Sequence, residues 1–302
     1  IKMDDLLAAR SQMAMSLAFH IIFAVIGIGM PLLMTIAEWR WLRTKEEVYL
    51  TLAKRWAKGT AILFAVGAVS GTVLSFELGL LFPGFMGYAG AIIGMPFSLE
   101  GFAFFTEAIF LGIYLYGWKR ISPRAHLFAG VMVALSGALS GIFVVIANAW
   151  MNTPTGFRWV NGQATDIDPV AAMFNPAAFQ QTLHMTIAAY LSTAAAVAGI
   201  HAYMLLRDRQ NPFHRAALGI ALGVLVVTAL LQPISGHYSA QVVAETQPAK
   251  LAAMEGLFKT QRSAPLLVGG FPDANTQTTP LAIEIPGALS FLADSSLETE
   301  VV

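Results

Sequence analysis

Two carboxylates stand inside an apolar run that is long enough to cross a lipid bilayer. The run covers residues 97–118, and the acids are Glu100 and Glu107. Seven residues make close to two helical turns, so both acids lie on one face of a helix, roughly 10 Å apart along its axis. An ionisable group at this depth costs about 3 kcal/mol or more, and it usually marks an ion path, a proton relay or a cofactor. The alternative is an acid that a neighbouring helix satisfies.

Two histidines lie at a similar depth in other apolar runs. His20 is in the run 15–37, and His184 is near the start of the run 182–206. At 1.5 Å per residue, we expect both to lie within about 15 Å of the outer surface, as the two acids do. Imidazole is a common axial ligand of haem iron, and a carboxylate can take the opposite face, so the four residues predict haem ligation with proton delivery. A core histidine bonded to a backbone carbonyl is the alternative for each.

Three further charged residues are candidates on the outer side. Arg10 precedes the first apolar run, near the depth where a haem propionate would emerge, and interfacial anchoring is its alternative. Lys250 and Glu255 lie on a short predicted helix over the outer face, and a solvated ion pair is the alternative there.

The remaining membrane histidines and one acid receive plainer interpretations. His126, His201 and His214 lie near the opposite ends of their runs, where headgroup contact is the default for such side chains. Glu77 lies near the outer end of its run, which indicates an interfacial side chain.

The composition predicts the membrane setting that these residues need. Of 302 residues, 56% are hydrophobic and 12% are charged, and the mean hydropathy is +0.64. Soluble domains carry about 25% charged residues, so this chain is an all-α integral membrane protein. The absence of Cys excludes disulfides, thiolate–zinc sites and cysteine-bound iron–sulfur clusters. A net charge of zero gives no indication of nucleic-acid binding.

Six membrane spans are predicted, at residues 15–37, 60–82, 97–118, 126–149, 182–206 and 216–235. Residues 1–14 precede them as an amphipathic lead-in. Clustered Lys and Arg occupy every second connection, those at 38–59, 119–125 and 207–215. The connections between these hold only Arg158, so the positive-inside rule places the N-terminus and everything after the sixth span outside. The chain therefore divides into a bundle at 1–235 and an outer-face region at 236–302.

Three of the spans carry small residues at the spacing that lets helices approach closely in lipid. The steps are Gly67/Gly71, Gly137/Gly141 and Gly219/Gly223. We expect these helices to pack tightly against neighbours. The connections before the third and fifth spans are rich in Gly, Pro and aromatic residues and are expected to form ordered caps over the bundle.

Five segments of the chain resemble, in order, subunit I of the cytochrome bd-type quinol oxidases. They are FHIIFAVIGIGMP around His20, SLEGFAFFTEAIFLGIYLYGW around Glu100, NAWMNTPTGF at 148–157, QTLHMTIAAY around His184 and PAKLAAMEG at 248–256. The resemblance implies nine spans in the full subunit, in paired four-helix bundles plus one helix, and three haems. It also implies that three spans, which carry the Met partner of His184 and the carboxylate ligand of the third haem, lie beyond residue 302.

The resemblance assigns a role to each oxygen-side candidate. His20 matches an axial ligand in the two-haem centre that reduces oxygen, Glu100 matches the carboxylate at that centre, and Glu107 matches a proton-path residue. Which high-spin haem His20 binds stays open. The implied cofactors are a low-spin haem b, a high-spin haem b, and either haem d or a further haem b.

The remaining matches concern electron entry. His184 matches one ligand of the low-spin haem, and Lys250 and Glu255 match the quinol-loop pair. The resemblance implies a bacterial inner-membrane location with the long loop on the periplasmic side. Its implied partners are quinol, dioxygen, membrane lipid, a second large membrane subunit and small single-span subunits.

The function expected from these residues is oxidation of quinol at the outer face and reduction of dioxygen to water. Protons released by quinol outside and protons taken up from the cytoplasm past Glu107 would separate charge without a pump. Two alternatives belong to other classes: a proton-coupled transporter that uses the Glu100 and Glu107 stripe, and a haem-binding assembly subunit without turnover.

Overall fold

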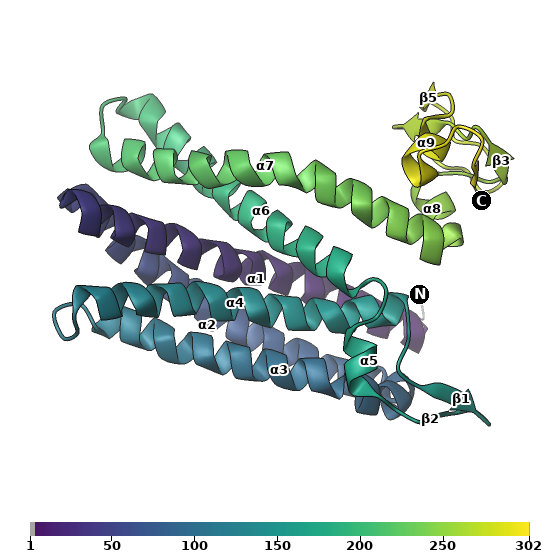
Figure 1. The fold of residues 1–302 in the computed structure, drawn as a ribbon, viewed down its shortest axis with the longest axis horizontal. Coiled ribbons are helices and arrows are strands. Elements are labelled where there is room, and N and C mark those ends of the chain that lie inside the picture. The colour runs from purple at the N-terminus through teal and green to yellow at the C-terminus, as the bar shows by residue number, and fades with distance from the viewer. Residues whose placement is uncertain (1–3, 302) are drawn as a thin grey trace.

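Six long apolar helices form the body of the molecule (Figure 1). The computed structural model describes residues 4–301. The long helices are α1 (Asp5–Thr44), α2 (Glu47–Leu81), α3 (Pro83–Tyr116), α4 (Pro123–Asn152), α6 (Ala178–Arg207) and α7 (Pro212–Thr246). Each is long and apolar enough to cross a membrane, which confirms the prediction of six spans.

The long helices pack as sequential pairs. α1 lies along α2, α3 along α4 and α6 along α7, while α1, α4 and α6 also contact one another. Short connections force each pair to run antiparallel. At two of these connections, the side chains of Ser122 and Asn211 accept hydrogen bonds from the first turns of α4 and α7, and a proline follows each cap.

All six long helices are longer than the predicted spans; α2, for example, begins at Glu47 and not at 60. α1 begins at Asp5, so the expected lead-in is part of this helix; residues 1–3 lie outside the described residues. α7 continues to Thr246, beyond the predicted end at 235. The segment 83–96, expected as a connection because of its Gly and Pro residues, is the first part of α3.

Burial explains the extra helical turns at the start of α3. Ala89, Ile92 and Ile93 are buried there and pack with Trp150 at the end of α4. Pro83 is the first helical residue, a position at which proline needs no backbone N–H. Tertiary packing has therefore overridden the local propensity of the Gly residues.

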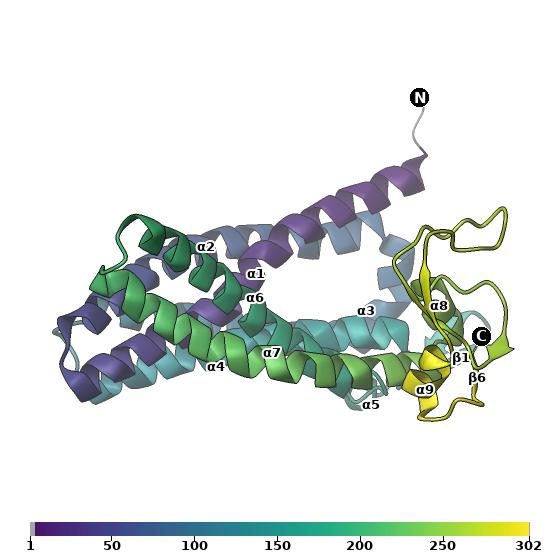
Figure 2. The ribbon, with the colours of Figure 1, turned by 90° about the horizontal axis from the view of Figure 1, so that it is seen from above.

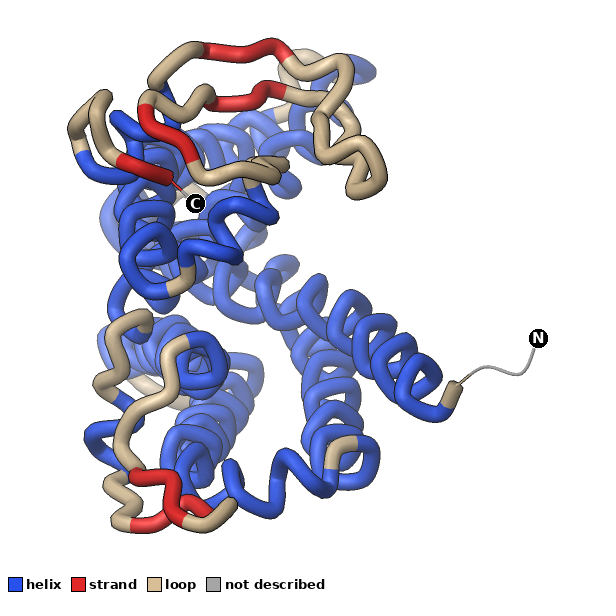
Figure 3. The backbone as a smooth tube through the Cα atoms, turned by 90° about the vertical axis from the view of Figure 1, so that its right-hand side faces the viewer, coloured by secondary structure: helices blue, strands red, loops and turns tan. Residues whose placement is uncertain are grey.

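The short elements gather at one end of the bundle, where the described start of α1 also lies (Figure 1). They are β1 (Arg158–Val160), β2 (Gln163–Thr165), α5 (Pro169–Met173), α8 (Pro248–Met254), β3 (Gln261–Arg262), β4 (Leu266–Val268), β5 (Ile283–Ile285), α9 (Ala288–Asp294) and β6 (Glu300–Val301). The strands pair antiparallel as β1–β2, β3–β6 and β4–β5 (Figure 3). We call this end the cap end and the other, which carries the clustered Lys and Arg, the basic end.

The main core lies toward the basic end and the helices open toward the cap end. Leu33, Met34, Leu52 and Val133 are almost fully buried in the largest cluster. The first turns of α1 diverge from α6 and α7 in Figure 2, and most of their side chains are exposed. Large apolar side chains also face outward along the helices, as expected for surfaces in contact with lipid.

Candidate functional site

His20 lies between α1 and α2, against a Ser-Gly dipeptide of α2. Its Nδ1 is 2.9 Å from the Oγ of Ser70. The Ser70 hydroxyl donates its single proton to a backbone carbonyl of its own helix, at Val66 (2.9 Å) or Gly67 (3.1 Å). With the hydroxyl proton used in this way, His20 Nδ1 would be the donor toward Ser70, which leaves the lone pair of the ring on Nε2.

His184 repeats this arrangement between α6 and α7. Its Nδ1 is 3.0 Å from the Oγ of Ser235, and the Ser235 hydroxyl donates to the carbonyl of Gln232 at 3.0 Å. The amide nitrogen of Gln232 lies 3.0 Å from His184 Nε2 and 3.2 Å from Nδ1, close to both ring nitrogens. Among the described residues, the Oε1 of Gln232 is buried without a hydrogen-bond partner. A buried amide oxygen without a hydrogen-bond donor therefore lies beside the imidazole.

Glu100 and Glu107 both face α4, as their seven-residue spacing predicts. Ser140 on α4 donates to Glu100 Oε1 at 3.3 Å. Glu107 is only 5% exposed, and a Cβ at Gly137 of α4 would lie 3.1 Å from its Oε1. The absence of a side chain at Gly137 gives this carboxyl group its space.

The two histidines and two acids do not make one compact cluster. His20 contacts α2, the acids contact α4, and His184 contacts α7. Within residues 4–301, no group of three or more His, Asp or Glu side chains is placed to hold a bare metal ion. The arrangement instead offers single ligands at separate places, which is how axial ligands of haem are supplied.

Near the start of α1, the structure corrects one interpretation. Glu77, expected to be interfacial, is 7% exposed and accepts hydrogen bonds from Gln12 Nε2 (3.0 Å) and Ser16 Oγ (2.8 Å). Arg10 lies on α1, as Gln12 and Ser16 do, and its side chain is exposed. Its role toward a propionate stays a prediction.

Lys250 anchors α8 to the end of α4. Its Nζ donates to Asn152 Oδ1 at 3.0 Å, and Gln247 Nε2 donates to the Asn152 carbonyl at 2.6 Å. In the described part of the chain, Lys250 and Glu255 do not form an ion pair, so the alternative of a solvated pair is wrong. Partial burial at the end of α8 raises the pKa of the Glu255 carboxyl above its usual range.

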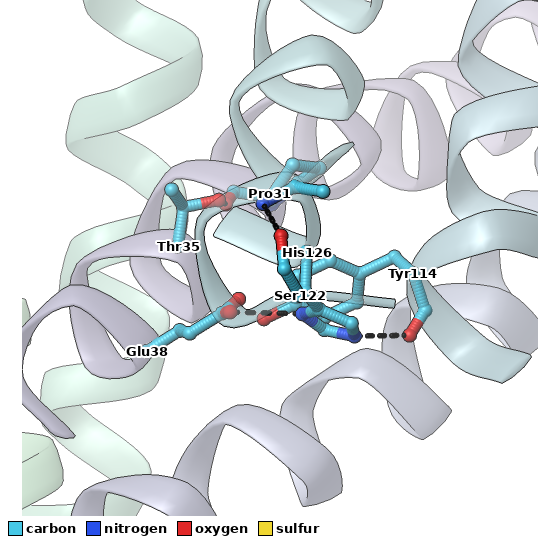
Figure 4. Close-up of polar contacts among 7 residues, drawn as sticks. Pro31, Thr35, Glu38, Tyr114, Ser122 and His126 are labelled. Carbon is cyan, nitrogen blue, oxygen red and sulfur yellow. Dashed lines mark hydrogen bonds and ion pairs between the residues drawn. The ribbon is translucent and has the colours of Figure 1, made fainter. Parts of the chain in front are cut away.

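A buried ion pair at the basic end was missed by the sequence analysis (Figure 4). His126 Nδ1 is 2.8 Å from Glu38 Oε1, and its Nε2 is 2.9 Å from the carbonyl oxygen of Tyr114. The expectation of headgroup contact is wrong for His126 and His201, which are 3% and 7% exposed. His201 and His214 bond each other through their Nδ1 atoms at 2.8 Å. An acid near the end of α1 and a histidine at the start of another span were the available signals.

The hydroxyl partners of the candidate residues were also missed, although the sequence marks them. The chain has four Ser-Gly dipeptides, all on α2, α4 and α7: Ser70-Gly71, Ser136-Gly137, Ser140-Gly141 and Ser235-Gly236. Ser70 lies against His20, Ser140 against Glu100 and Ser235 against His184. The glycine of the fourth dipeptide, Gly137, lies beside Glu107. The predicted close packing is confirmed for the steps on α2 and α4. It is wrong for Gly219/Gly223, beside which the described residues leave open space.

Comparisons with known proteins identify the family of this chain. The family model for cytochrome bd terminal oxidase subunit I matches residues 8–302. The chain belongs to this family. The structure of bd oxidase from Geobacillus thermodenitrificans superposes with a TM-score of 0.94 at 40% identity, over 99% of this chain and 69% of that one.

Curated relatives agree with the family assignment. A Bacillus subtilis (strain 168) protein, provisionally named cytochrome bd menaquinol oxidase subunit I, is 43% identical over 99% of this chain. The cytochrome bd ubiquinol oxidase subunit 1 of the same strain is 33% identical over 96%, and cytochrome bd-II ubiquinol oxidase subunit 1 of Escherichia coli (strain K12) is 32% identical over 97%. The chain spans 68%, 63% and 58% of the lengths of these relatives. The cytochrome bd family is one of quinol oxidases, which are membrane oxidoreductases of electron transport.

Proposed function

We propose that this chain is the haem-binding subunit of a quinol:oxygen oxidoreductase. The observation that carries the proposal is that Nδ1 of both His20 and His184 lies within 3.0 Å of a serine oxygen. Donation of Nδ1–H to that serine would leave Nε2 as a ligand atom, with the Gln232 amide displaced from Nε2 of His184. The residues therefore fit haem. When bound, the haems would carry electrons from quinol and supply the iron at which dioxygen is reduced.

Quinol would bind at the cap end beside α8. Lys250 holds α8 against α4 and can donate to a quinol oxygen, while Glu255 can receive a proton from a quinol hydroxyl. The raised pKa of Glu255 suits proton exchange with a hydroxyl better than that of an exposed carboxylate would. His184, near the cap-end start of α6, would be the histidine that serves electron entry.

Protons for oxygen reduction would pass along the interface of α3 and α4. Glu107 occupies the space that Gly137 leaves, and Glu100 lies two helical turns nearer the cap end with a hydrogen bond from Ser140. We place the cap end outside and the basic end in the cytoplasm, following the positive-inside rule. Quinol protons would then leave outside and oxygen protons arrive from inside, which separates charge without pumping.

The proposed assembly follows the family. His20 and Glu100 would serve the oxygen-reducing centre, His184 the low-spin haem b, and Arg10 a propionate. The other cofactors would be a high-spin haem b and either haem d or a further haem b. Partners would be lipid, quinol, dioxygen, a second large membrane subunit and small single-span subunits, in a bacterial inner membrane with the cap end periplasmic.

The test is oxygen uptake by the complete oxidase assembled with this chain. Added ubiquinol or menaquinol should drive uptake, and Lys250→Ala should raise the quinol KM while leaving the visible spectrum unchanged. Lys259→Ala, an exposed lysine on the same segment, is the matched control and should change neither. A haem-loaded complex without quinol-dependent uptake would favour an assembly role. A complex without haem would favour transport.

A further inference from the structure

The two candidate ligand histidines occupy matching environments on unrelated helix pairs. His20 lies against Ser70-Gly71 of α2, and His184 lies against Ser235-Gly236 of α7. In both cases the serine Oγ is within 3.0 Å of Nδ1, and Cε1 of the ring lies over the glycine that follows. The same serine, glycine and imidazole arrangement therefore occurs on two helix pairs.

The proton count at each serine fixes the direction of the bond. A hydroxyl has one proton, and both serines can donate it to a backbone carbonyl in the preceding turn. Each serine oxygen can then only accept from the imidazole. The contrast is Ser140, which donates its proton to the carboxylate of Glu100 instead. The same dipeptide therefore acts as an acceptor toward histidine and as a donor toward an acid.

The glycines let each ring lie close to the backbone of the partner helix. A Cβ at Gly71 would be 3.0 Å from Cε1 of His20, closer than an ordinary contact. A Cβ at Gly236 would be 3.5 Å from Cε1 of His184, which is ordinary contact. The His20 site is therefore the tighter of the two.

We propose that Ser70 and Ser235 are positioning residues that hold His20 and His184 as the Nδ1–H tautomer, with Nε2 directed to haem iron. At His184 the haem takes the place of the Gln232 amide, which lies 3.0 Å from Nε2. This inference rests on the proposed function. Hydrogen bonding at the far nitrogen fixes the orientation of a ligand imidazole and raises its basicity. A more basic ligand favours the ferric state, so each serine lowers the reduction potential of the haem bound by its histidine.

The test is a redox titration of the complete oxidase, followed in the visible spectrum. Loss of the hydrogen-bond partner at the ring nitrogen that does not bind the metal changes metal affinity or activity about 10- to 100-fold. We expect Ser235→Ala to raise the potential of the low-spin haem by ~59 mV, which corresponds to a tenfold change for a one-electron couple. Ser70→Ala should shift a high-spin haem in the same direction.

Matched controls separate this role from helix packing. Within residues 4–301, the hydroxyls of Ser75 on α2 and Ser192 on α6 bond only to backbone carbonyls, so Ser75→Ala and Ser192→Ala should leave both potentials unchanged. The conservative variants Ser70→Thr and Ser235→Thr keep the hydroxyl and should restore the original potentials.

Each outcome decides the question. Unchanged potentials in Ser70→Ala and Ser235→Ala, with haem retained, would overturn the inference. If the alanine variants lose haem, retention of haem by the threonine variants supports the hydroxyl role, and loss in both contradicts it. If His20→Ala and His184→Ala themselves leave the haem spectrum unchanged, the proposed function fails, whatever the serine variants show.

Discussion

Removal of the Glu38 carboxylate should strongly destabilise the helix bundle at its basic end. Glu38 and His126 lie 2.8 Å apart with side chains that are 0% and 4% exposed, and the ring also bonds the Tyr114 carbonyl (Figure 4). Breaking a buried pair by deleting one partner costs about 3–5 kcal/mol, because the other charge stays buried without compensation. Glu38→Ala should therefore raise the ratio of unfolded to folded chain by about 100- to 4,000-fold, since 1.4 kcal/mol is tenfold.

The assay is unfolding in mixed micelles of increasing SDS fraction, followed by tryptophan fluorescence. The Trp118 ring centroid lies 3.9 Å from that of His126, so its share of the emission from the six tryptophans changes when this site unfolds. Arg158→Ala is the control, because the Arg158–Asp166 pair has side chains that are 77% and 60% exposed. Such a pair contributes about 0–1 kcal/mol. Equal, small shifts for Glu38→Ala and Arg158→Ala would refute the reasoning.

Three further predictions follow from the site. Gly71→Ala should lower haem content and Gly236→Ala should not, because their Cβ atoms would lie 3.0 and 3.5 Å from the facing imidazoles; haem per polypeptide measures this, and equal losses would contradict it. Glu107→Ala should slow oxygen uptake at constant haem content, whereas loss of all haem would count against a proton role. Burial raises the pKa of the Glu255 carboxyl from its usual 4.5, so the folded state keeps this group protonated above that pH. The stability that the bound proton contributes is fully present below the unfolded pKa and is lost as pH rises through the raised pKa. Infrared titration should show a protonated carboxyl band that Glu255→Gln removes; a band titrating at the ordinary value would be evidence against it.

The number of long helices and the positions of the candidate site residues along them could be predicted, because both depend on local sequence. A run of about 20 apolar residues predicts a span whatever its neighbours are, and seven-residue spacing places Glu100 and Glu107 on one face. The aromatic side chains in the connections before the third and fifth spans also predicted that these two segments would be ordered.

Partners across helices could not be predicted, because they depend on which helices pack together. Nothing local to His126 indicates that Glu38 faces it, 88 positions earlier in the chain. The same holds for Asn152, which binds Lys250 only because α8 folds back onto the end of α4. The start of α3 was missed for a related reason: its glycines favour a loop, and only burial against Trp150 favours the helix.

The most direct test of haem ligation is the reduced-minus-oxidised visible spectrum of the complete oxidase, recorded with the native chain and with His184→Ala. We predict that the native complex shows a low-spin haem band and that His184→Ala lacks it while signals from the oxygen-reducing centre remain. An identical spectrum from the two complexes would contradict the assignment of His184, and with it the electron-entry site.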